Sequence, residues 1–514
     1  MDGTSKIRAS LLARGVLVAL LLLAAGCAVK PPAPKPNALW VLGADMPAFD
    51  PDGPPDPLRW AIERYLSAGL VETDSTGAVI PAAAGAIDVS DDSLVYTFRL
   101  RPALAFVDGS PCRSGEFARA LEAGLARTDH STRVWQLAAV RGVDRVRAGK
   151  PLPVLGIEAP DDRTLVIRLV KRDPLFLRKL AIPGTGWPWK RRDVSRWTDA
   201  VGLGPDRVMA GDTVRQIVLA RAPIAPVRPR SMPDTVTMRF QPSAVKVRSM
   251  LRTGRPDFVW PVPPGVLSEA LPPGYRGVSR PSVPARRLAL VMRADVPPTT
   301  RLATRHALAH GINRADVLRA LGTFASDNES WIPGAPPLEF PELDPQAIEM
   351  WRERGKLGRS FHVTMAYDAN GPAAVAARAM QGEWAGHAIY VELRPLAGRA
   401  LQGELLGGVS QLALGELGDL VEGPAGVLST LIMPFRGPAV GSIRSGWRTR
   451  EFDGWIDPRH APVIWKPAQV QRRLEEERVV LPIARLPWLW LERVGAAEAP
   501  FHPDRGPDCP LPAR

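Results

Sequence analysis

The sequence predicts an α/β protein with more than one lobe, and three observations lead to this class. The chain has 514 residues, which is too long for one ordinary hydrophobic core. Short runs with strand-like alternation are mixed along its length with segments of helical periodicity. The 54 prolines and 45 glycines indicate many loops and turns between these segments. Because strands and helices do not alternate strictly, we expect irregular insertions in the architecture.

The first residues have the composition of an export signal. Lys6, Arg8 and Arg14 precede an apolar run of about ten residues at 16–25. A bilayer-spanning helix needs roughly twenty apolar residues, so this run is too short to be a stable transmembrane anchor. It is typical of a secretory signal peptide, which predicts that residues 1–26 are removed.

The end of this signal predicts a lipid anchor. Residues 23–27, Leu-Ala-Ala-Gly-Cys, resemble a bacterial lipobox, in which the cysteine receives a diacylglycerol and becomes the mature N-terminus. We therefore expect Cys27 to carry a lipid, followed by a Pro-rich tether at 27–37. The expected location is periplasmic or extracytoplasmic, with the choice of membrane left open. A plain signal peptide with an unmodified cysteine is the alternative.

Charge and cysteine content give weaker information. The net charge is +13, but the basic residues are scattered, and the densest run is the three residues at 190–192. The chain has no basic stripe with interleaved aromatic residues, which is the pattern that would indicate nucleic-acid binding. Cys112 and Cys509 could form a disulfide in an oxidising compartment or remain two free thiols, and their spacing does not indicate a metal site.

The N-terminal half contains four clear strand patterns and three helical ones. The strongest strand, at 94–100, alternates apolar and polar residues and is bounded by Asp91-Asp92 and Pro102. The predicted strands are 38–42, 94–100, 163–169 and 236–240, and the predicted helices are 58–70, 114–126 and 243–252.

The C-terminal half repeats this mixture with longer helices. The predicted strands are 288–292, 361–366, 389–393 and 479–483, and the predicted helices are 300–320, 372–386 and 468–477.

Catalytic motifs are not evident in the chain. His306 and His310 stand four apart on a predicted helix, but the metalloprotease pattern needs glutamate after the first histidine, and Ala307 stands there. Neither a G-x-S-x-G elbow nor a phosphate-binding Gly-rich loop with Lys-Ser/Thr occurs. We expect no enzyme activity, no cofactor and no bound metal.

Several segments resemble one known family. Residues 91–101 are close to its Asp-rich turn and Tyr-Thr-Phe-x-Leu-Arg strand, 106–111 to its Phe-x-Asp-Gly-x-Pro turn, and 158–164 to its Glu-Ala-Pro-Asp turn. Residues 66–70 and 304–314 resemble two of its helices. The chain therefore resembles the bacterial extracellular solute-binding proteins of family 5, the oligopeptide-, dipeptide- and nickel-binding receptors of ABC transporters.

The resemblance implies a fold and a partner set. The fold would be two-lobed and periplasmic-binding-protein-like, of type II in the large peptide-binder class, with an additional domain inserted in the N-terminal lobe. The lobes would close on a peptide or peptide-like ligand and deliver it to ABC transporter permease subunits, and the protein would be a monomer. The implied layout is lobe I at 38–80, 192–285 and 479–500, the extra domain at 81–191, lobe II at 286–478 and a C-terminal tail at 501–514.

The resemblance also implies candidate ligand-binding residues. Asp419 lies where peptide binders of the family hold the amino group of the ligand, and Glu416 lies where the family has a tryptophan. Trp135, Trp187 and Trp260 lie near expected cleft segments, although most tryptophans belong to cores. A solvated loop carboxylate is the alternative for Asp419.

The sequence also predicts a structural role for two arginines and leaves two alternative functions open. Arg305 and Arg314 are expected to tie their helix to neighbouring carboxylates rather than to bind ligand. A receptor-derived lipoprotein with a degenerate site, acting as a structural or sensory partner, is the second functional hypothesis. A binder of glycans or metal chelates is the third.

Overall fold

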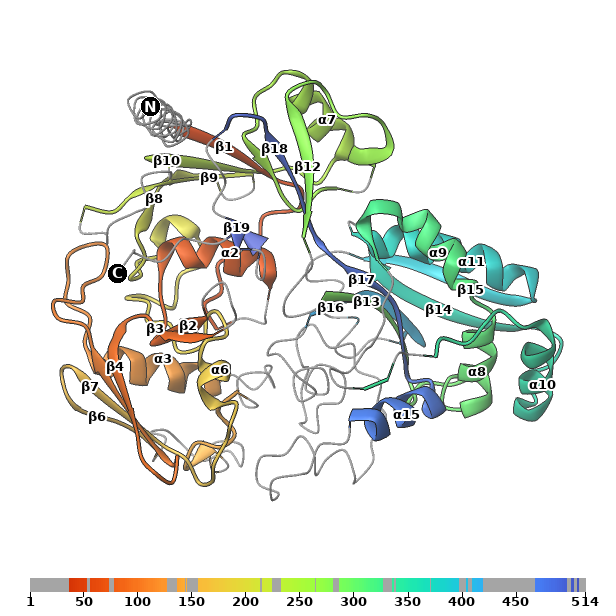
Figure 1. The fold of residues 1–514 in the computed structure, drawn as a ribbon, viewed down its shortest axis with the longest axis horizontal. Coiled ribbons are helices and arrows are strands. Elements are labelled where there is room, and N and C mark those ends of the chain that lie inside the picture. Colours follow the sequence, from red (N-terminus) through yellow and green to blue (C-terminus); the bar gives the residue numbers. More distant parts are fainter. Residues whose placement is uncertain are drawn as a thin grey trace, which may run out of the picture.

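The computed structural model contains three large β-sheets flanked by helices (Figure 1). The sheets have seven, five and four strands, and two short two-stranded sheets, β2 (Val71–Thr73) with β3 (Val79–Pro81) and β19 (Phe501–His502) with β20 (Gly506–Pro507), complete them. The described residues are 37–52, 56–73, 78–126, 136–143, 145, 156–212, 215–223, 233–263, 265–280, 286–326, 335–336, 339–369, 371–396, 404, 409–418, 467–496, 501–502 and 506–507.

The seven-stranded sheet is built around β1 near its centre. β1 runs parallel to β10 and β11, and the other strand pairs are antiparallel. Trp40 of β1 packs against Tyr65 of α2 (Pro57–Leu66), with ring centroids 5.7 Å apart. In sheet order the strands are β12 (Tyr275–Arg280), β18 (Trp488–Arg493), β11 (Phe258–Val259), β1 (Asn37–Leu42), β10 (Thr235–Phe240), β9 (Gln216–Arg221) and β8 (Asp206–Gly211).

The four-stranded sheet belongs to the N-terminal part of the chain and has its own core. α3 (Ser114–Ala126) and α6 (Phe176–Leu180) accompany it, and Phe98, Phe117 and Phe176 are completely buried there. In sheet order the strands are β4 (Ala84–Val89), β5 (Val95–Leu100), β7 (Thr164–Arg168) and β6 (Ile157–Asp161), all antiparallel.

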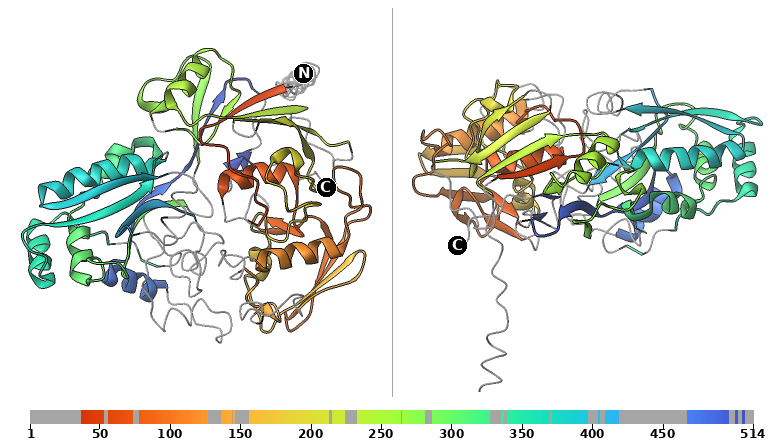
Figure 2. Two further views of the ribbon diagram at one scale, coloured as in Figure 1. Left: turned by 180° about the vertical axis from the view of Figure 1, so that it is seen from behind. Right: turned by 90° about the horizontal axis from the view of Figure 1, so that it is seen from above.

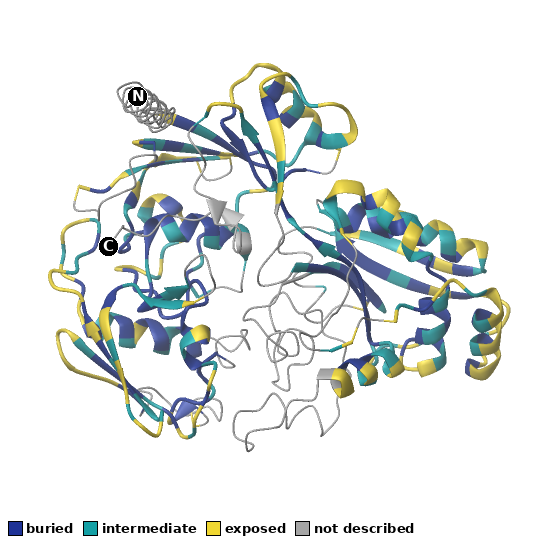
Figure 3. Cartoon of the chain, viewed as in Figure 1, coloured by how far each residue is buried: buried dark blue, intermediate teal, exposed yellow. Residues whose placement is uncertain are grey.

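The five-stranded sheet forms the second half of the molecule. Alternate residues of β14, such as Met365, join Trp384 of α11 in a fully buried core, whereas His362 is exposed on the other face of the sheet. Figure 3 shows the strands mostly buried and the outward faces of the helices exposed. In sheet order the strands are β15 (Ile389–Leu396), β14 (Phe361–Asp368), β16 (Leu412–Gly418), β13 (Arg286–Met292) and β17 (Val480–Leu486). The helices of this half are α8 (Leu302–His310), α9 (Arg314–Leu321), α10 (Pro345–Gly355), α11 (Pro372–Gly386) and α15 (Pro467–Glu477).

The remaining helical segments are short. α7 (Ala244–Arg252) begins after Ser243, whose hydroxyl accepts a hydrogen bond from the Lys246 N–H. Three single 3₁₀ turns cover Trp197–Asp199, Val266–Ser268 and Gly322–Phe324. None of the helices among the described residues is long and apolar enough to cross a membrane.

Two neighbouring strand connections join the seven-stranded and five-stranded sheets. The chain leaves the seven-stranded sheet at the end of β12 and enters the five-stranded sheet at β13, and it returns from β17 to β18 across the single residue Pro487. β12 pairs with β18 and β13 pairs with β17, so the strands that flank the two connections run antiparallel. The two halves lie side by side when viewed from above (Figure 2).

Most predicted elements are confirmed, and two helices coincide with the prediction over their full length. These are α3 at 114–126 and α11 at 372–386. The predicted helix at 58–70 is shorter, because α2 ends at Leu66.

The single long helix predicted at 300–320 is wrong. The structure has two helices, because α8 ends at His310 with Gly311 as its C-cap, and Asn313 caps α9, its side chain accepting a hydrogen bond from the Asp316 N–H. Gly311 and Asn313, separated by Ile312, provide the stop and start signals.

Arg305 on α8 has the predicted carboxylate partner, whereas the bond of Arg314 on α9 goes to a backbone carbonyl. The buried Arg305 guanidinium donates to the backbone carbonyl of Glu477 at 2.7 Å and pairs with its carboxylate at 3.1 Å. Arg314 donates to the carbonyl of Ile483 at 2.9 Å.

The candidate disulfide partners are Cys112 and Cys509. Cys112 is a free, buried thiol, and burial raises its pKa to about 12. Cys509 lies outside the described residues.

Candidate functional site

The boundary between the two large sheets brings together charged and aromatic side chains distant in sequence. Arg286 is the first residue of β13 and lies between Leu486 of β17 and Gly418 of β16 in the register of the sheet. Glu416 lies on β16 two residues before Gly418, diagonal to Arg286. Diagonal neighbours on adjacent strands are within reach of long side chains. The pairing of β13 with β16 therefore places a guanidinium beside a carboxylate where the chain changes sheets.

Arg286 and Glu416 form a two-point ion pair. The Nε of Arg286 donates to Oε1 of Glu416, and Nη2 donates to Oε2 at 2.5 Å. The side chains are 17% and 32% exposed, respectively, so both are shielded from bulk water over most of their surface. Paired N–H···O bonds of this type hold the plane of a guanidinium fixed.

The same guanidinium reaches the seven-stranded sheet. Its Cζ lies 4.0 Å from the ring centroid of Trp488, and Nη1 donates to the carbonyl of Pro487 at 3.3 Å. Trp488 packs in turn against Trp260, with ring centroids 5.7 Å apart, within the aromatic core of that half. A continuous set of contacts therefore joins Glu416 on one side of the boundary to Trp260 on the other.

Trp187, the second predicted ligand-binding tryptophan among the described residues, is a core residue like Trp260. Trp187 is 6% exposed and Trp260 is 3% exposed. Trp187 packs over Gly69, where an added Cβ would lie 2.6 Å from the indole Nε1. Arg192 holds the segment by donating to the Trp187 carbonyl at 3.0 Å and by an ion pair with Asp52. In this arrangement neither indole offers more than a small part of its surface to a ligand.

The remaining candidates lie outside the described residues. These are Asp419, Trp135 and Cys27. β16 ends at Gly418, immediately before Asp419 in the sequence.

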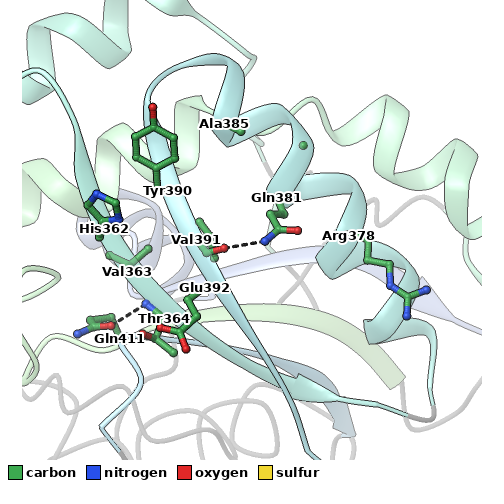
Figure 4. Close-up of a pocket in the computed structure, with 11 residues that line it drawn as sticks. His362, Val363, Thr364, Arg378, Gln381, Ala385, Tyr390, Val391, Glu392 and Gln411 are labelled. Carbon is green, nitrogen blue, oxygen red and sulfur yellow. Dashed lines mark hydrogen bonds between the residues drawn. The ribbon is translucent and has the colours of Figure 1, made fainter.

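A separate cavity of about 570 Å³ lies in the five-stranded half (Figure 4). Gln381 of α11 donates to the Val391 carbonyl of β15 at 2.8 Å, and the Gln411 side chain accepts from the Thr364 N–H at 2.8 Å. Tyr390 and His362 stack beside them with ring centroids 5.0 Å apart. The described lining comes from residues 362–411 alone, so this cavity is not shared with the seven-stranded sheet.

The two helical histidines do not form a metal site in the described structure. His306 stacks on Trp351 at 4.2 Å between ring centroids, and its Nε2 lies 2.9 Å from the carbonyl of Glu476. Burial lowers the pKa of His306 to about 4, with smaller contributions from nearby cationic groups. The described residues contain no cluster of three or more His, Cys, Asp or Glu that could hold a metal ion.

The three sheets and the paired crossings define a two-lobed, type II periplasmic-binding-protein-like fold with an additional domain in the N-terminal lobe. A family model described as bacterial extracellular solute-binding proteins, family 5 (middle part) matches residues 78–431. The chain belongs to this family, whose members are binding proteins rather than enzymes. The expected fold class and family are thereby confirmed.

Individual relatives agree with this assignment. The periplasmic oligopeptide-binding protein OppA of Escherichia coli K12 is 30% identical over 193 residues, which are 35% of this chain and 35% of OppA. The chain thus matches about a third of the length of this relative.

Solved structures support the fold. The murein tripeptide binding protein MppA of E. coli superposes with a TM-score of 0.76 at 19% identity, covering 91% of this chain and 97% of MppA. DppA from Helicobacter pylori in complex with the peptide STSA gives 0.75 at 17% identity, covering 90% and 94%. The unliganded open form of MppA gives 0.58 at 18% identity, again covering 90% and 94%.

Proposed function

We propose that this chain is an extracytoplasmic receptor that captures peptides or peptide-like solutes between its two lobes and delivers them to the permease of an ABC transporter. The observation that carries the proposal is the joining of two separately cored lobes by adjacent strand crossings at Arg280–Arg286 and Leu486–Trp488. Lobes joined in this way can close on a solute by hinge bending. The solute leaves unchanged, so the protein makes and breaks no covalent bond.

Asp419 is the proposed anchor for the ligand. A buried ammonium group needs a carboxylate partner, because an unpaired buried charge is costly. Asp419 follows directly after β16, whose start lies in the sheet core of lobe II. Trp135 is a proposed aromatic contact, and Trp187 and Trp260 would act from behind as supports for the cleft wall.

The proposed domain layout follows the sheets. Lobe I holds the seven-stranded sheet, the extra domain at 81–191 holds the four-stranded sheet, and lobe II begins at Arg286. We place the end of lobe II at Pro487 instead of 478, because β17 pairs in the five-stranded sheet and β18 in the other.

The lipid on Cys27 would hold the receptor at a membrane surface. Removal of 1–26 and attachment of a diacylglycerol leave Cys27 as the first residue of a protein that acts as a monomer. Intact mass measurement of protein purified from membranes tests this part, because a Cys27→Ala variant would lack the lipid mass and leave the membrane fraction.

A thermal-shift screen with peptide pools tests binding itself. Ligand that binds the folded state raises its stability by about 2.7 kcal/mol at a concentration 100-fold above Kd. We expect a pool of peptides to raise Tm, and pools of sugars or nickel chelates to leave it unchanged. A Tm raised by sugars or nickel chelates alone would replace the peptide ligand by one of those classes.

One observation keeps a second function under test. Glu416, at a position where the family has a tryptophan, is engaged by Arg286. A receptor-derived lipoprotein with a degenerate site, serving as a structural or sensory partner, would show no Tm change with any pool.

A further inference from the structure

The cluster at the lobe boundary combines contacts within one lobe with contacts between lobes. The ion pair of Arg286 with Glu416 lies wholly in the five-stranded sheet. The contacts of Arg286 with Pro487 and Trp488 lead out of that sheet into the return crossing. One side chain thus connects lobe II to the first residue of the strand that re-enters lobe I.

Trp488 is fixed to lobe I by backbone and side-chain contacts. It pairs with Arg280, the last residue of β12, and its buried indole packs against Trp260. Both crossings therefore contribute to the cluster: Arg280 and Arg286 bound the outgoing one, and Leu486 and Trp488 bound the return.

Glu416 orients the guanidinium of Arg286 over the indole of Trp488. A guanidinium held at two nitrogens by a carboxylate has a fixed plane, and an indole face attracts a cation placed over it. Lysine could keep the charge but could not form the fork and the stacked plane together. The arrangement thus depends on arginine at 286 and on a carboxylate at 416.

In the described structure the place where the chain changes sheets is bounded by Arg280 and Arg286 on one crossing and by Leu486 and Trp488 on the other. Arg286 belongs to the sheet of lobe II and Trp488 to the sheet of lobe I, so a rotation of the lobes would change the 4.0 Å separation of guanidinium and indole. The chain superposes on one structure of MppA with a TM-score of 0.76 and on the unliganded open form of the same protein with 0.58, and we take the described arrangement as the closed one.

We propose that Arg286 and Glu416 are a positioning pair that stabilises the closed arrangement of the lobes by holding lobe II against Trp488, without touching the ligand. The effect of the pair on lobe closure does not depend on the proposed function, whereas its consequence, tighter ligand binding, rests on that function. Loss of an inter-lobe contact lowers the closed fraction, and apparent affinity falls by the same factor. We expect a change of about fivefold in the ratio of closed to open protein, as for a cation–π contact of about 1 kcal/mol.

The test measures lobe arrangement directly, in the absence of ligand. Spin labels are attached at Val245→Cys on α7 and Met350→Cys on α10, because the side chains of Val245 and Met350 are 78% and 43% exposed. Double electron–electron resonance between the two labels then measures the inter-lobe distance. The native cysteines at 27, 112 and 509 are replaced first, and the label pair is checked for an unchanged melting curve.

Two variants remove the interaction in different ways, and a matched variant serves as control. Glu416→Gln removes the charge that orients the guanidinium, and Arg286→Lys removes the fork. Arg293→Lys is the control, because Arg293, which follows the last residue of β13, forms a similar two-point pair with Asp295, at 3.0 and 3.2 Å, within lobe II.

The expected result is a shift of the distance distribution towards the open population in Glu416→Gln and Arg286→Lys, and none in Arg293→Lys. Unchanged distributions in the first two variants, or an equal shift in all three, would overturn the proposal. If one variant fails to fold, Trp488→Phe serves in its place, since it weakens the cation contact while keeping an aromatic core residue. A shift in lobe distance in a protein that binds no peptide would reject the proposed function and leave this positioning role standing.

Discussion

The indole N–H of Trp384 donates to the backbone carbonyl of Leu308 at 2.9 Å, which bonds α11 to the last turn of α8. The ring lies so close that an added Cβ on Gly311 would stand 2.7 Å from its Cδ1. Trp384 is fully buried, so the ring has no room to move aside. The break between α8 and α9 is therefore fixed by packing as well as by local sequence.

This contact predicts the effect of filling Gly311. Gly311→Ala should lower the free energy of unfolding by about 1–3 kcal/mol, the usual cost of overpacking a core. Gly382→Ala is the control: it lies in α11 with no atom within 4 Å of an added Cβ, and alanine should stabilise a helix interior by about 0.5–1 kcal/mol. Urea denaturation measures both, and equal effects of the two substitutions would contradict the packing argument.

A buried ion pair in the extra domain predicts a second stability effect. Lys179 and Asp173 are 2.7 Å apart with side chains 5% and 6% exposed. Asp173→Asn should destabilise by about 3 kcal/mol, because Lys179 loses the buried carboxylate that faces it. Asp88→Asn, which breaks an exposed pair with Arg99, should cost no more than about 1 kcal/mol. Similar losses of unfolding free energy in Asp173→Asn and Asp88→Asn would show that burial of an ion pair does not determine how much its loss destabilises the protein.

The pKa of His306 predicts a dependence of stability on pH. Burial lowers this pKa to about 4 in the folded protein, against about 6.5 when unfolded, so the unfolded state binds the proton more readily between these values. The contribution of His306 is full above pH 6.5 and is lost as the pH falls towards 4.

His306→Phe keeps a ring against Trp351 and removes the titrating group. The variant should lose less Tm than the parent protein between pH 6.5 and pH 4. His362→Phe, at an exposed position on the far face of the sheet, should follow the parent curve. Parallel curves for parent and His306→Phe would contradict the assigned protonation.

Asp419 predicts a ligand selectivity. If the proposed anchor role holds, Asp419→Asn should weaken binding of peptides with a free amino terminus by about 2 kcal/mol or more, because the ligand ammonium loses its proposed carboxylate partner. N-acetylated peptides, which lack the ammonium group, should bind both proteins alike in calorimetric titrations. An equal loss for both kinds of peptide would remove Asp419 from the anchor role.

Much of the fold could be predicted from local pattern. The strand at 95–100 and the helices at 114–126 and 372–386 have strong periodicity and clear ends, so their bounds agree with the structure. Strands such as β16, interrupted by glycine and glutamate, lack an alternating pattern and were not predicted. Their conformation is imposed by the strands beside them, which are distant in sequence.

The candidate site shows the same division. Glu416 was selected as a ligand contact, whereas the structure gives it Arg286 as a partner 130 residues away. Only the pairing of β13 with β16 reveals this neighbour. Pro487 between two apolar runs is a local sign of a crossing, but Pro482, also between apolar residues, lies inside β17, so proline alone does not locate it.

The return across Pro487 has a consequence for the modular construction of the molecule. Arg286 and Leu486 are direct partners in the sheet, so the polypeptide enters and leaves lobe II at adjacent points. A segment whose ends meet in this way can be excised as a unit, expressed separately or exchanged for the corresponding segment of a relative without stretching the remaining backbone. Such chimaeras would transplant one wall of the binding region while the other is retained.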